Sequence, residues 1–357
     1  MLGIFGLLLL VSACQSNPEP QNGAYFPPLE GEWETEKPQN VCWNVDALPD
    51  LYDYLESTNT RAFIMLKDGK IIVEQYWGRT LDNSADFGPE SNWYWASAGK
   101  TLIAFLVGQA QSDSILSIQD TTSAYLGVGW TSLAPESEQR ITIRNQLSMT
   151  TGLNDLVVDP TCTTPNCLQY LTDAGRRWAY HNAPYTLLHE VIEEASQTNF
   201  TSYFREKLAD KIGMDGQWLS VDNNKVYFST ARAMARFGWL IVNEGVWNGE
   251  DLLNDARYFG DMTSSSQNLN LSYGYLWWLN GKNNFMVPGL QTVFNGPLAP
   301  RAPSTLIAAL GKNGQMLQVI PDMGIVIVRL GDTPDPSQVP LAYLDDLWGY
   351  INPVLKR

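Results

Sequence analysis

The residues of this sequence whose types and spacing most clearly suit chemistry are Ser97 and Lys100, in the segment 95–100 (WASAGK). The apolar run after Lys100 predicts a buried helix with Ser97 in its first turn. Positions three apart share one helix face, so the hydroxyl and the amine point into the same space. A lysine whose pKa falls from about 10.4 toward neutrality activates a serine as a nucleophile. The same spacing also fits an ordinary helix start with Ser97 as N-cap.

Two further short motifs carry polar groups that suit such a site. Tyr180 and Asn182 lie two residues apart, and Lys312 begins a Lys-Asn-Gly turn after an apolar strand. Taken alone, each motif is also explained as a buried tyrosine with a turn asparagine, or as a turn lysine. The order Ser-Lys, Tyr-Asn, Lys-Gly is more specific than any one motif. The two histidines, His181 and His189, are expected to support structure and not catalysis.

The elements that must position these residues suggest an α+β fold. Short β-rich runs occur at both ends of the chain, and a helix-rich part lies between them, over about 115–300. We therefore predict one antiparallel sheet built from both termini and flanked by helices, with the helix-rich part as an inserted subdomain. The predicted strands are 61–66, 70–77, 304–310, 316–320 and 325–330. The predicted helices after the Ser97 helix are 141–153, 185–196, 201–212, 230–242 and 341–351.

The composition restricts the class of protein. The chain has 357 residues, 44% of them hydrophobic, which is enough for one large domain or two average ones. The 23 basic and 38 acidic side chains give a net charge of −15, spread along the chain. An acidic surface argues against nucleic acid as a partner and identifies no substrate.

The N-terminus has the features of an export signal. The apolar run from Leu2 to Val11 is too short to span a bilayer and fits the core of a secretory signal. Small residues precede Cys14, which resembles a bacterial lipobox and implies cleavage after residue 13 and lipid attachment to Cys14. A plain signal peptide is the alternative. We predict a signal at 1–13, a flexible tether at 14–40 and the catalytic domain at 41–357. The protein would then be anchored by lipid on the periplasmic face of a bacterial membrane, the outer membrane in preference.

The other three cysteines suit an exported protein. Cys162 and Cys167 flank a turn-forming Thr-Thr-Pro-Asn stretch and are candidates for a disulfide. Cys42 is then left over, and we expect a buried, unpaired thiol. Three cysteines without a suitably spaced histidine make poor metal ligands, so no metal site is predicted.

With the three motifs in this order, the chain resembles the serine β-lactamase and penicillin-binding-protein superfamily. It is most similar to the class C-like branch, which includes esterases, D-aminopeptidases and 6-aminohexanoate-oligomer hydrolases. The resemblance runs from about residue 62 to residue 330. Besides the three motifs it includes the segments 149–153 (MTTGL) and 311–315 (GKNGQ), and the closing strands after them.

The resemblance implies a role for each motif residue. Ser97 would be the acyl-accepting nucleophile, and Lys100 would take its proton or hold it electrostatically. Tyr180 would relay protons to the leaving group and later activate water, while Asn182 would bind Lys100 or the substrate amide. Which of Lys100 and Tyr180 is the acylation base stays open. A tyrosinate near the ammonium groups of Lys100 and Lys312 is expected to have a pKa well below 10.

The third motif completes the implied site and also departs from the family pattern. Lys312 would supply the second cation, and Gly314 would form the turn. The backbone N–H groups of Ser97 and Gln315 would form the oxyanion hole. Asn313 replaces the Thr or Ser that β-lactam-processing relatives use to bind the substrate carboxylate. This replacement puts antibiotic turnover in doubt.

The predicted function is hydrolysis of a small-molecule or peptide-like ester or amide through a covalent acyl-enzyme. A DD-carboxypeptidase or a weak β-lactamase is the alternative within this class. A Ser-His-Asp hydrolase is disfavoured because the chain has only two histidines and no Gly-x-Ser-x-Gly. A non-catalytic envelope binding or sensor lipoprotein is the alternative of another class. Side chains fill every catalytic role, so no cofactor is expected, and the membrane enters only through the lipid anchor. The oligomeric state is not readable.

Overall fold

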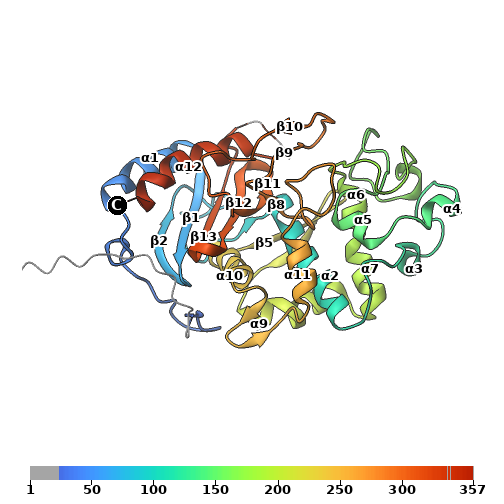
Figure 1. Ribbon diagram of the computed structural model, residues 1–357. Coiled ribbons are helices and arrows are strands. Elements are labelled where there is room, and N and C mark those ends of the chain that lie inside the picture. Colours follow the sequence, from blue (N-terminus) through green and yellow to red (C-terminus); the bar gives the residue numbers. More distant parts are fainter. Residues whose placement is uncertain (1–23, 336, 338, 357) are drawn as a thin grey trace, which may run out of the picture.

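The centre of the molecule is an antiparallel sheet of six strands in the order β2-β1-β13-β12-β11-β8 (Figure 1). The computed structural model describes residues 24–335, 337 and 339–356. The strands are β1 (Thr60–Lys67), β2 (Lys70–Tyr76), β8 (Trp278–Leu279), β11 (Ile307–Gly311), β12 (Gln315–Ile320) and β13 (Ile325–Gly331). The predicted α+β fold, with a sheet built from both ends of the chain, is confirmed.

Local sequence explains the two hairpins that bring the chain ends together. Asp68 and Gly69 join β1 to β2 with positive φ values of 51° and 84°, as a tight hairpin turn requires. β12 and β13 are joined through Pro321–Met323 and Gly324, which has a φ of 60°. β13 then pairs with β1, which closes the N-terminal and C-terminal hairpins into one sheet.

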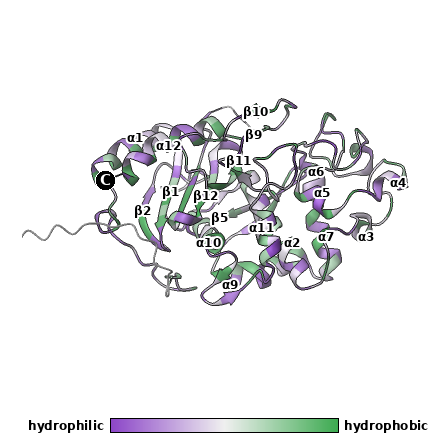
Figure 2. Cartoon of the chain, in the orientation of Figure 1, coloured by the Kyte–Doolittle hydropathy of each residue, from purple (hydrophilic) through white to green (hydrophobic). Residues whose placement is uncertain are grey.

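Helices cover both faces of this sheet. α1 (Leu48–Ser57) and α12 (Leu341–Leu355) pack side by side on one face, and α10 (Ala231–Val242) packs on β1, β12 and β13 from the other (Figure 1). Trp348 of α12 donates its indole N–H to Gln318 Oε1 of β12 at 2.7 Å, so the buried amide of that strand is satisfied. Apolar residues concentrate between these layers, while polar residues lie on their outer surfaces (Figure 2).

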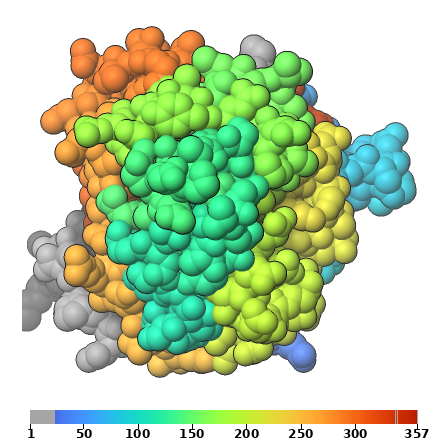
Figure 3. All heavy atoms as spheres, turned by 90° about the vertical axis from the view of Figure 1, so that its right-hand side faces the viewer, coloured from blue at the N-terminus to red at the C-terminus, as the bar shows by residue number. Residues whose placement is uncertain are grey.

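The helix-rich part lies beside the sheet, at the right of Figure 1, and Figure 3 views it end-on. Its central element is α2 (Lys100–Ser112), whose residues 100–110 are all buried. A helix that is apolar all round belongs in a core, as the sequence predicted. The surrounding helices are α3 (Ser123–Leu126), α4 (Pro135–Glu138), α5 (Ile143–Leu147), α6 (Asn182–Thr186), α7 (Leu188–Ser196), α8 (Phe200–Phe204), α9 (Asp210–Ile212) and α11 (Ala256–Met262).

Some predicted element boundaries are wrong. The helix expected over 141–153 ends at Leu147, because Met149 has a left-handed φ of 58°. The helix expected over 201–212 is interrupted by a π-helical turn at Arg205–Ala209. A second sheet of β3 (Trp93–Tyr94), β5 (Asn224–Ser229) and β4 (Gln217–Val221) was not predicted. The remaining short strands pair as β6 (Val246–Trp247) with β7 (Glu250–Asp251), and β9 (Asn284–Phe285) with β10 (Phe294–Asn295).

Residues 24–40 are not a tether. Trp33 is buried and donates its indole N–H to the carbonyl of Gly69 at 2.7 Å. Trp239 of α10 donates in the same way to the carbonyl of Tyr25 at 2.9 Å, and Thr35 pairs with Ile71 of β2. The prediction of a flexible segment through residue 40 is therefore wrong for this stretch, because its aromatic side chains dock on the sheet domain. The predicted signal and Cys14 lie outside the described residues. Among the helices that the structure does describe, none has the length and apolar character needed to cross a bilayer.

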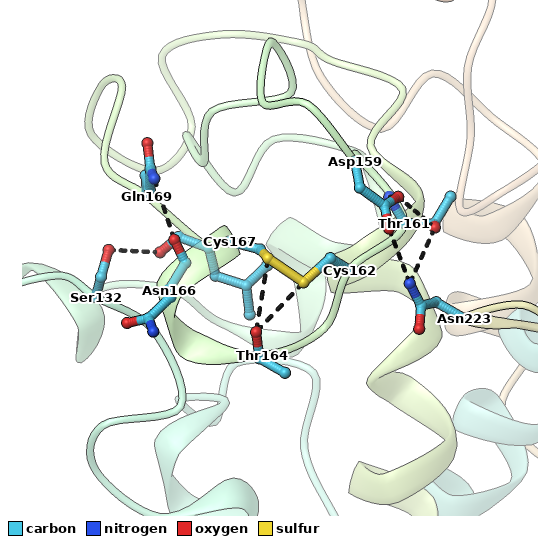
Figure 4. Close-up of a disulfide and its surroundings, with 10 residues drawn as sticks. Ser132, Asp159, Thr161, Cys162, Thr164, Asn166, Cys167, Gln169 and Asn223 are labelled. Atoms are coloured by element: carbon cyan, nitrogen blue, oxygen red, sulfur yellow. Dashed lines mark hydrogen bonds between the residues drawn. A yellow bond between two sulfur atoms is a disulfide. The ribbon is translucent and has the colours of Figure 1, made fainter.

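The predicted disulfide between Cys162 and Cys167 is present, with an S–S distance of 2.04 Å (Figure 4). It closes a small loop whose neighbours Asp159 and Thr161 both accept hydrogen bonds from Asn223, at the β4–β5 turn. The expectation for Cys42 is wrong. Cys42 lies partly exposed at the end of a surface turn and is disulfide-bonded, so it is neither buried nor unpaired.

Candidate active site

Ser97 lies in a 3-10 turn, η3 (Ala96–Gly99), that leads directly into α2. It is thus one turn ahead of the α-helix in which we expected it. Ala96 has a positive φ of 47°, a conformation that costs free energy for a residue with a Cβ and is often found at functional turns. Trp95 fixes the start of the turn, because its indole N–H donates to Ser229 Oγ at 2.7 Å. Ser97 is partly exposed, while Ala98, Gly99 and Lys100 behind it are buried.

Lys100 meets Ser97 as the spacing predicts. A hydrogen bond of 3.1 Å joins its Nζ to Ser97 Oγ. The lysine is 4% exposed, and burial lowers its pKa from 10.5 to about 7. Desolvation disfavours the charged form of an amine, and no opposite charge among the described residues compensates for it. A large fraction of Lys100 is therefore neutral near pH 7 and able to accept a proton from the serine.

Tyr180 also reaches Ser97, but with a different protonation from the one expected. Burial raises the pKa of Tyr180 above its ordinary value, and a hydrogen bond with Ser97 acts weakly in the opposite direction. The prediction of a tyrosinate is thus wrong for this structure. Lys100 Nζ lies over the Tyr180 ring, 5.1 Å from its centroid. The phenol keeps its proton and is placed to donate it.

Asn182 begins α6, two residues beyond Tyr180. Its Oδ1 is buried and has no hydrogen-bond partner among the residues that the structure describes. Of the two predicted partners, Lys100 and the substrate amide, Lys100 forms no hydrogen bond to this oxygen. A buried acceptor without a partner costs free energy, so this amide is available to a donor from a bound substrate.

The end of β11 lies directly against η3, the turn that carries Ser97. A Cβ on Gly311 would lie 2.4 Å from the carbonyl oxygen of Trp95 and 3.0 Å from the amide nitrogen of Ala98. Only glycine permits this approach. The next residue, Lys312, therefore begins its short turn, η6 (Lys312–Gly314), beside Ser97.

Buried hydrogen bonds hold the η6 turn in place. The guanidinium of Arg329, which is fully buried, donates to the carbonyls of Asn313 and Gly314 at 2.8 and 3.0 Å. Asn313 has a φ of 64°, and its amide donates to the hydroxyl of Tyr94 at 2.8 Å. Gly314 has a φ of 76°, as predicted for a turn glycine. The Asn313 side chain is thus engaged by the protein itself.

The structure does not fit the roles predicted for Lys312, as a cation beside Tyr180, and for the Gln315 N–H, as an oxyanion donor. The pKa shift of Tyr180 has two causes, burial and the bond to Ser97, and the exposed Lys312 ammonium is neither of them. Gln315 is completely buried, and its side chain exchanges hydrogen bonds with Gly331 at 2.7 and 3.0 Å. Its backbone N–H is closed to a substrate because Gln315 is already the first residue of β12, inside the sheet.

The sequence motifs did not predict the aromatic wall that lies behind Lys100 and Tyr180. The Tyr180 ring stacks on Trp278 at 5.9 Å and meets Tyr273 edge-on at 6.2 Å. Trp178 contacts both of these rings, at 6.2 and 5.4 Å. Trp178, Tyr273 and Trp278 are at most 1% exposed, so they exclude water from Lys100 and form no open acyl pocket. The only sequence signal was the richness in Trp and Tyr, which does not separate core from site.

Neither histidine is arranged for catalysis. His181 is buried beside the ion pair of Arg177 and Asp155, and burial lowers its pKa to about 4. Both of its ring nitrogens lack a hydrogen-bond partner within the described part of the chain. His189 stacks on Phe200 at 4.2 Å, and burial lowers its pKa to about 3. A Ser-His-Asp triad requires an imidazole bonded to both partners, so the geometry gives that alternative no support.

Two loops that carry exposed apolar side chains are attached to the segment bearing Tyr180. In the loop 154–161, Leu156 and Val158 are among the most exposed large hydrophobic residues, and the carbonyl of Pro160 accepts a hydrogen bond from the amide of Ala183 at 3.2 Å. In the loop 286–293, Leu290 and Val293 are about half exposed. This second loop is fixed by Gln291, whose amide donates to the carbonyl of Trp178 at 3.1 Å. Both loops that adjoin the Tyr180 segment thus present apolar side chains to solvent.

A family model described as Beta-lactamase matches residues 56–347. The chain belongs to the Beta-lactamase family. The match includes Ser97, Lys100, Tyr180 and the η6 turn. As a Beta-lactamase-family protein, the chain is related to serine hydrolases and penicillin-binding-protein homologues.

Individual relatives are distant. An uncharacterised protein of Alkalihalophilus pseudofirmus is 26% identical, and the alignment covers 81% of this chain and 88% of that protein. The 6-aminohexanoate-dimer hydrolase of Paenarthrobacter ureafaciens is 22% identical, with 81% and 77% covered. The solved structure of a penicillin-binding-protein homologue from Caulobacter crescentus superimposes with a TM-score of 0.63 at 15% identity, covering 84% of this chain and 98% of that one. This structural likeness supports the fold alone.

Proposed function

We propose that this protein is a serine hydrolase that cleaves an ester or amide through an acyl-enzyme on Ser97. The observation that carries the proposal is the 3.1 Å contact between Ser97 Oγ and the buried Lys100 Nζ, with the lysine pKa lowered to about 7. A neutral amine at hydrogen-bond distance is the general base that a serine nucleophile needs.

The protonation states suggest an order of proton transfers. Lys100 is the group whose pKa lies near neutrality, so it accepts the Ser97 proton as the hydroxyl attacks the carbonyl carbon. Tyr180 carries a proton at neutral pH and is bonded to Ser97, so it donates to the leaving alcohol or amine. The Lys100 ammonium then returns a proton to Tyr180, and water repeats the sequence on the acyl-enzyme. On this assignment the acylation base is Lys100.

The oxyanion formed in each step needs two N–H donors. Ser97 and Lys312 each lie at the start of a 3-10 turn, where backbone N–H groups have no acceptor within the helix. The close approach of Gly311 to Ala98 brings these two turns together. We therefore assign the oxyanion hole to the N–H groups of Ser97 and Lys312, and the second replaces that of Gln315. Loss of one such donor typically costs about 10²–10³ in kcat.

The surroundings favour substrates with an apolar acyl portion and no carboxylate beside the reacting carbonyl. The loops 154–161 and 286–293 carry exposed apolar side chains, and each loop is hydrogen-bonded to a residue within three positions of Tyr180. Asn313, in place of a carboxylate-binding hydroxyl, is bonded to Tyr94. Esters of medium-length acids and linear amides fit these features better than β-lactams or peptides ending in D-alanine. The names of the relatives, a 6-aminohexanoate-dimer hydrolase and a penicillin-binding-protein homologue, leave the choice to experiment.

One experiment tests the function and ranks the substrates. The purified protein and its Ser97→Ala variant are assayed on nitrocefin, p-nitrophenyl esters of two to twelve carbons, D-Ala-D-Ala peptides and aminohexanoate oligomers. We expect ester or linear-amide turnover by the wild type alone, and a mass increase equal to one acyl group on Ser97. Undiminished turnover by the alanine variant would refute the nucleophile, and no turnover with no labelling by a fluorophosphonate would favour a binding protein.

We also propose that the enzyme works outside the cytoplasm, exported by the signal predicted at 1–13. The proposal rests on the apolar run 2–11 before Cys14 and on the Cys162–Cys167 disulfide, which needs an oxidising compartment to persist. Cell fractionation, with mass spectrometry of the N-terminal peptide for cleavage and for a lipid on Cys14, tests it. Recovery of the unprocessed chain from the cytosol would contradict it.

A further inference from the structure

The ring of Tyr185 contacts the catalytic amine, although no motif assigns it a role. Tyr185 lies in α6, three residues after Asn182, and is 3% exposed. Its ring centroid lies 4.3 Å from Lys100 Nζ, closer than the 5.1 Å that separates the amine from the Tyr180 ring. The amine therefore lies between two aromatic faces, with Ser97 as its hydrogen-bond partner.

The groups around the amine explain why a ring is useful there. An aromatic face attracts an ammonium ion, and the attraction is stronger where water is absent. The titratable neighbours are phenols, those of Tyr180 and Tyr185, with Tyr273 behind them. His189 on the adjoining α7 meets the Tyr185 ring edge-on at 6.1 Å and also packs against Phe200 and Trp218. Burial lowers the pKa of His189 to about 3, so this imidazole stays neutral between pH 6 and pH 9. In the described part of the chain, burial is the sole cause of the shift at Lys100, and no carboxylate or second ammonium contributes to it.

We propose that Tyr185 is a positioning residue that holds the Lys100 amine at Ser97 through the face of its ring, an inference that rests on the proposed function. A carboxylate in the same place would also hold the ammonium, but it would raise the lysine pKa and keep the base charged. A ring stabilises the ammonium less, so the amine stays fixed and can still lose its proton near neutral pH. The role requires the aromatic face of Tyr185 and not its hydroxyl.

The test compares Tyr185→Phe, which keeps the ring, with Tyr185→Leu, which keeps an apolar side chain without one. Tyr203→Leu is the matched control, because Tyr203 is equally buried and its ring lies 5.9 Å from the amine of Lys207, on the same helical stretch. The readouts are the pH profile of kcat/KM and the unfolding free energy of each variant at pH 6 and pH 9.

Loss of the ring destabilises the ammonium form, so the lysine pKa falls. We expect the acidic limb for Tyr185→Leu to move to lower pH by about half to one and a half units, from the usual strength of a desolvated cation–π contact. We expect kcat to fall about tenfold or more because the amine is no longer held in place. Tyr185→Phe should keep the wild-type limb, and Tyr203→Leu should lose stability with an unchanged profile.

The unfolding measurements do not depend on catalysis, so they separate this proposal from the proposed function. The destabilisation of Tyr185→Leu relative to Tyr185→Phe should be larger at pH 6, where the ammonium needs the ring, than at pH 9. An equal difference at both pH values, or an unshifted acidic limb for Tyr185→Leu, would overturn the positioning role. Full activity of Ser97→Ala would overturn the hydrolase mechanism and leave the stability comparison valid.

Discussion

Replacement of Lys100 by methionine should stabilise the fold, and the gain should depend on pH. Methionine keeps an unbranched chain that fits the space of the lysine stem and removes the amine. In the wild type the folded pKa is about 7, whereas the unfolded value is 10.5. Between these values the unfolded chain binds more protons than the folded one, so wild-type stability rises with pH across that window and is lowest below pH 7.

The size of the effect follows from the two pKa values. The difference between 10.5 and about 7 corresponds to about 5 kcal/mol at 1.36 kcal/mol per pH unit. This penalty is complete below pH 7 and has fallen to about 2 kcal/mol at pH 9. The variant carries no such penalty, while every other group titrates alike in both proteins. The difference in unfolding free energy between Lys100→Met and the wild type should therefore shrink by about 2.5 kcal/mol from pH 6 to pH 9.

Urea unfolding of both proteins at pH 6, 7, 8 and 9, with the disulfides intact, measures this difference directly. Lys225→Met is the matched control, because Lys225 Nζ also bonds a serine, Ser220, at 2.9 Å, but at an exposed position. The difference in unfolding free energy between Lys225→Met and the wild type should vary little with pH. The acidic limb of kcat/KM should have its midpoint at the same pH as the stability effect, near 7. A Lys100→Met difference that stays constant from pH 6 to pH 9 would refute the buried, neutral base.

Two other predictions test the parts that hold the site together. Gly311→Ala should lower kcat at least tenfold, because its Cβ would meet the Trp95 carbonyl at 2.4 Å and push the Lys312 amide away from Ser97. Gly88→Ala, where the added Cβ meets nothing within 4 Å, should leave kcat unchanged. Equal activity of the two variants would contradict the role of Gly311 in the close approach of β11 to the Ser97 turn. Cys162→Ser with Cys167→Ser should lower the unfolding free energy by about 2 kcal/mol, the chain-entropy value for a loop of this length. Denaturant unfolding that is unchanged by the double substitution would contradict that expectation.

Local patterns predicted the elements of this fold better than their ends. The strands at the two termini were predictable because strong turn residues such as Asp68 and Gly69 bound runs of β-branched side chains. The end of α5 was not predictable, because a methionine at position 149 gives no sign of the left-handed conformation that it adopts. The small sheet β3-β5-β4 was missed since β3 has two residues and pairs only through tertiary contacts. The docked segment 24–40 was missed because its polar composition hides two anchoring aromatic residues.

The site was predictable where it depends on spacing along one element, and not where it depends on the environment. Ser97 and Lys100 meet because three residues separate them, and this holds although the turn is 3-10 in character. The charge state of Tyr180 was mispredicted because it depends on burial by residues as far along the chain as Trp278. The second oxyanion donor was predicted at Gln315, whereas we assign it to Lys312. Gln315 lies inside the sheet, as the first residue of β12, and Lys312 lies in the exposed turn before it.

The structure reaches an activated serine by a different electrostatic route from the one that the motifs suggested. Two ammonium groups would lower the pKa of a tyrosine and make it the base. Here a single amine is enclosed by Tyr180, Tyr185 and the rings behind them, and burial lowers the pKa of the amine itself. The same burial raises the pKa of Tyr180, so in the proposed mechanism one cause provides both a base and an acid beside Ser97. The roles of Lys100 and Tyr180 are thus set together, and a polar substitution that hydrates this wall should weaken both at once.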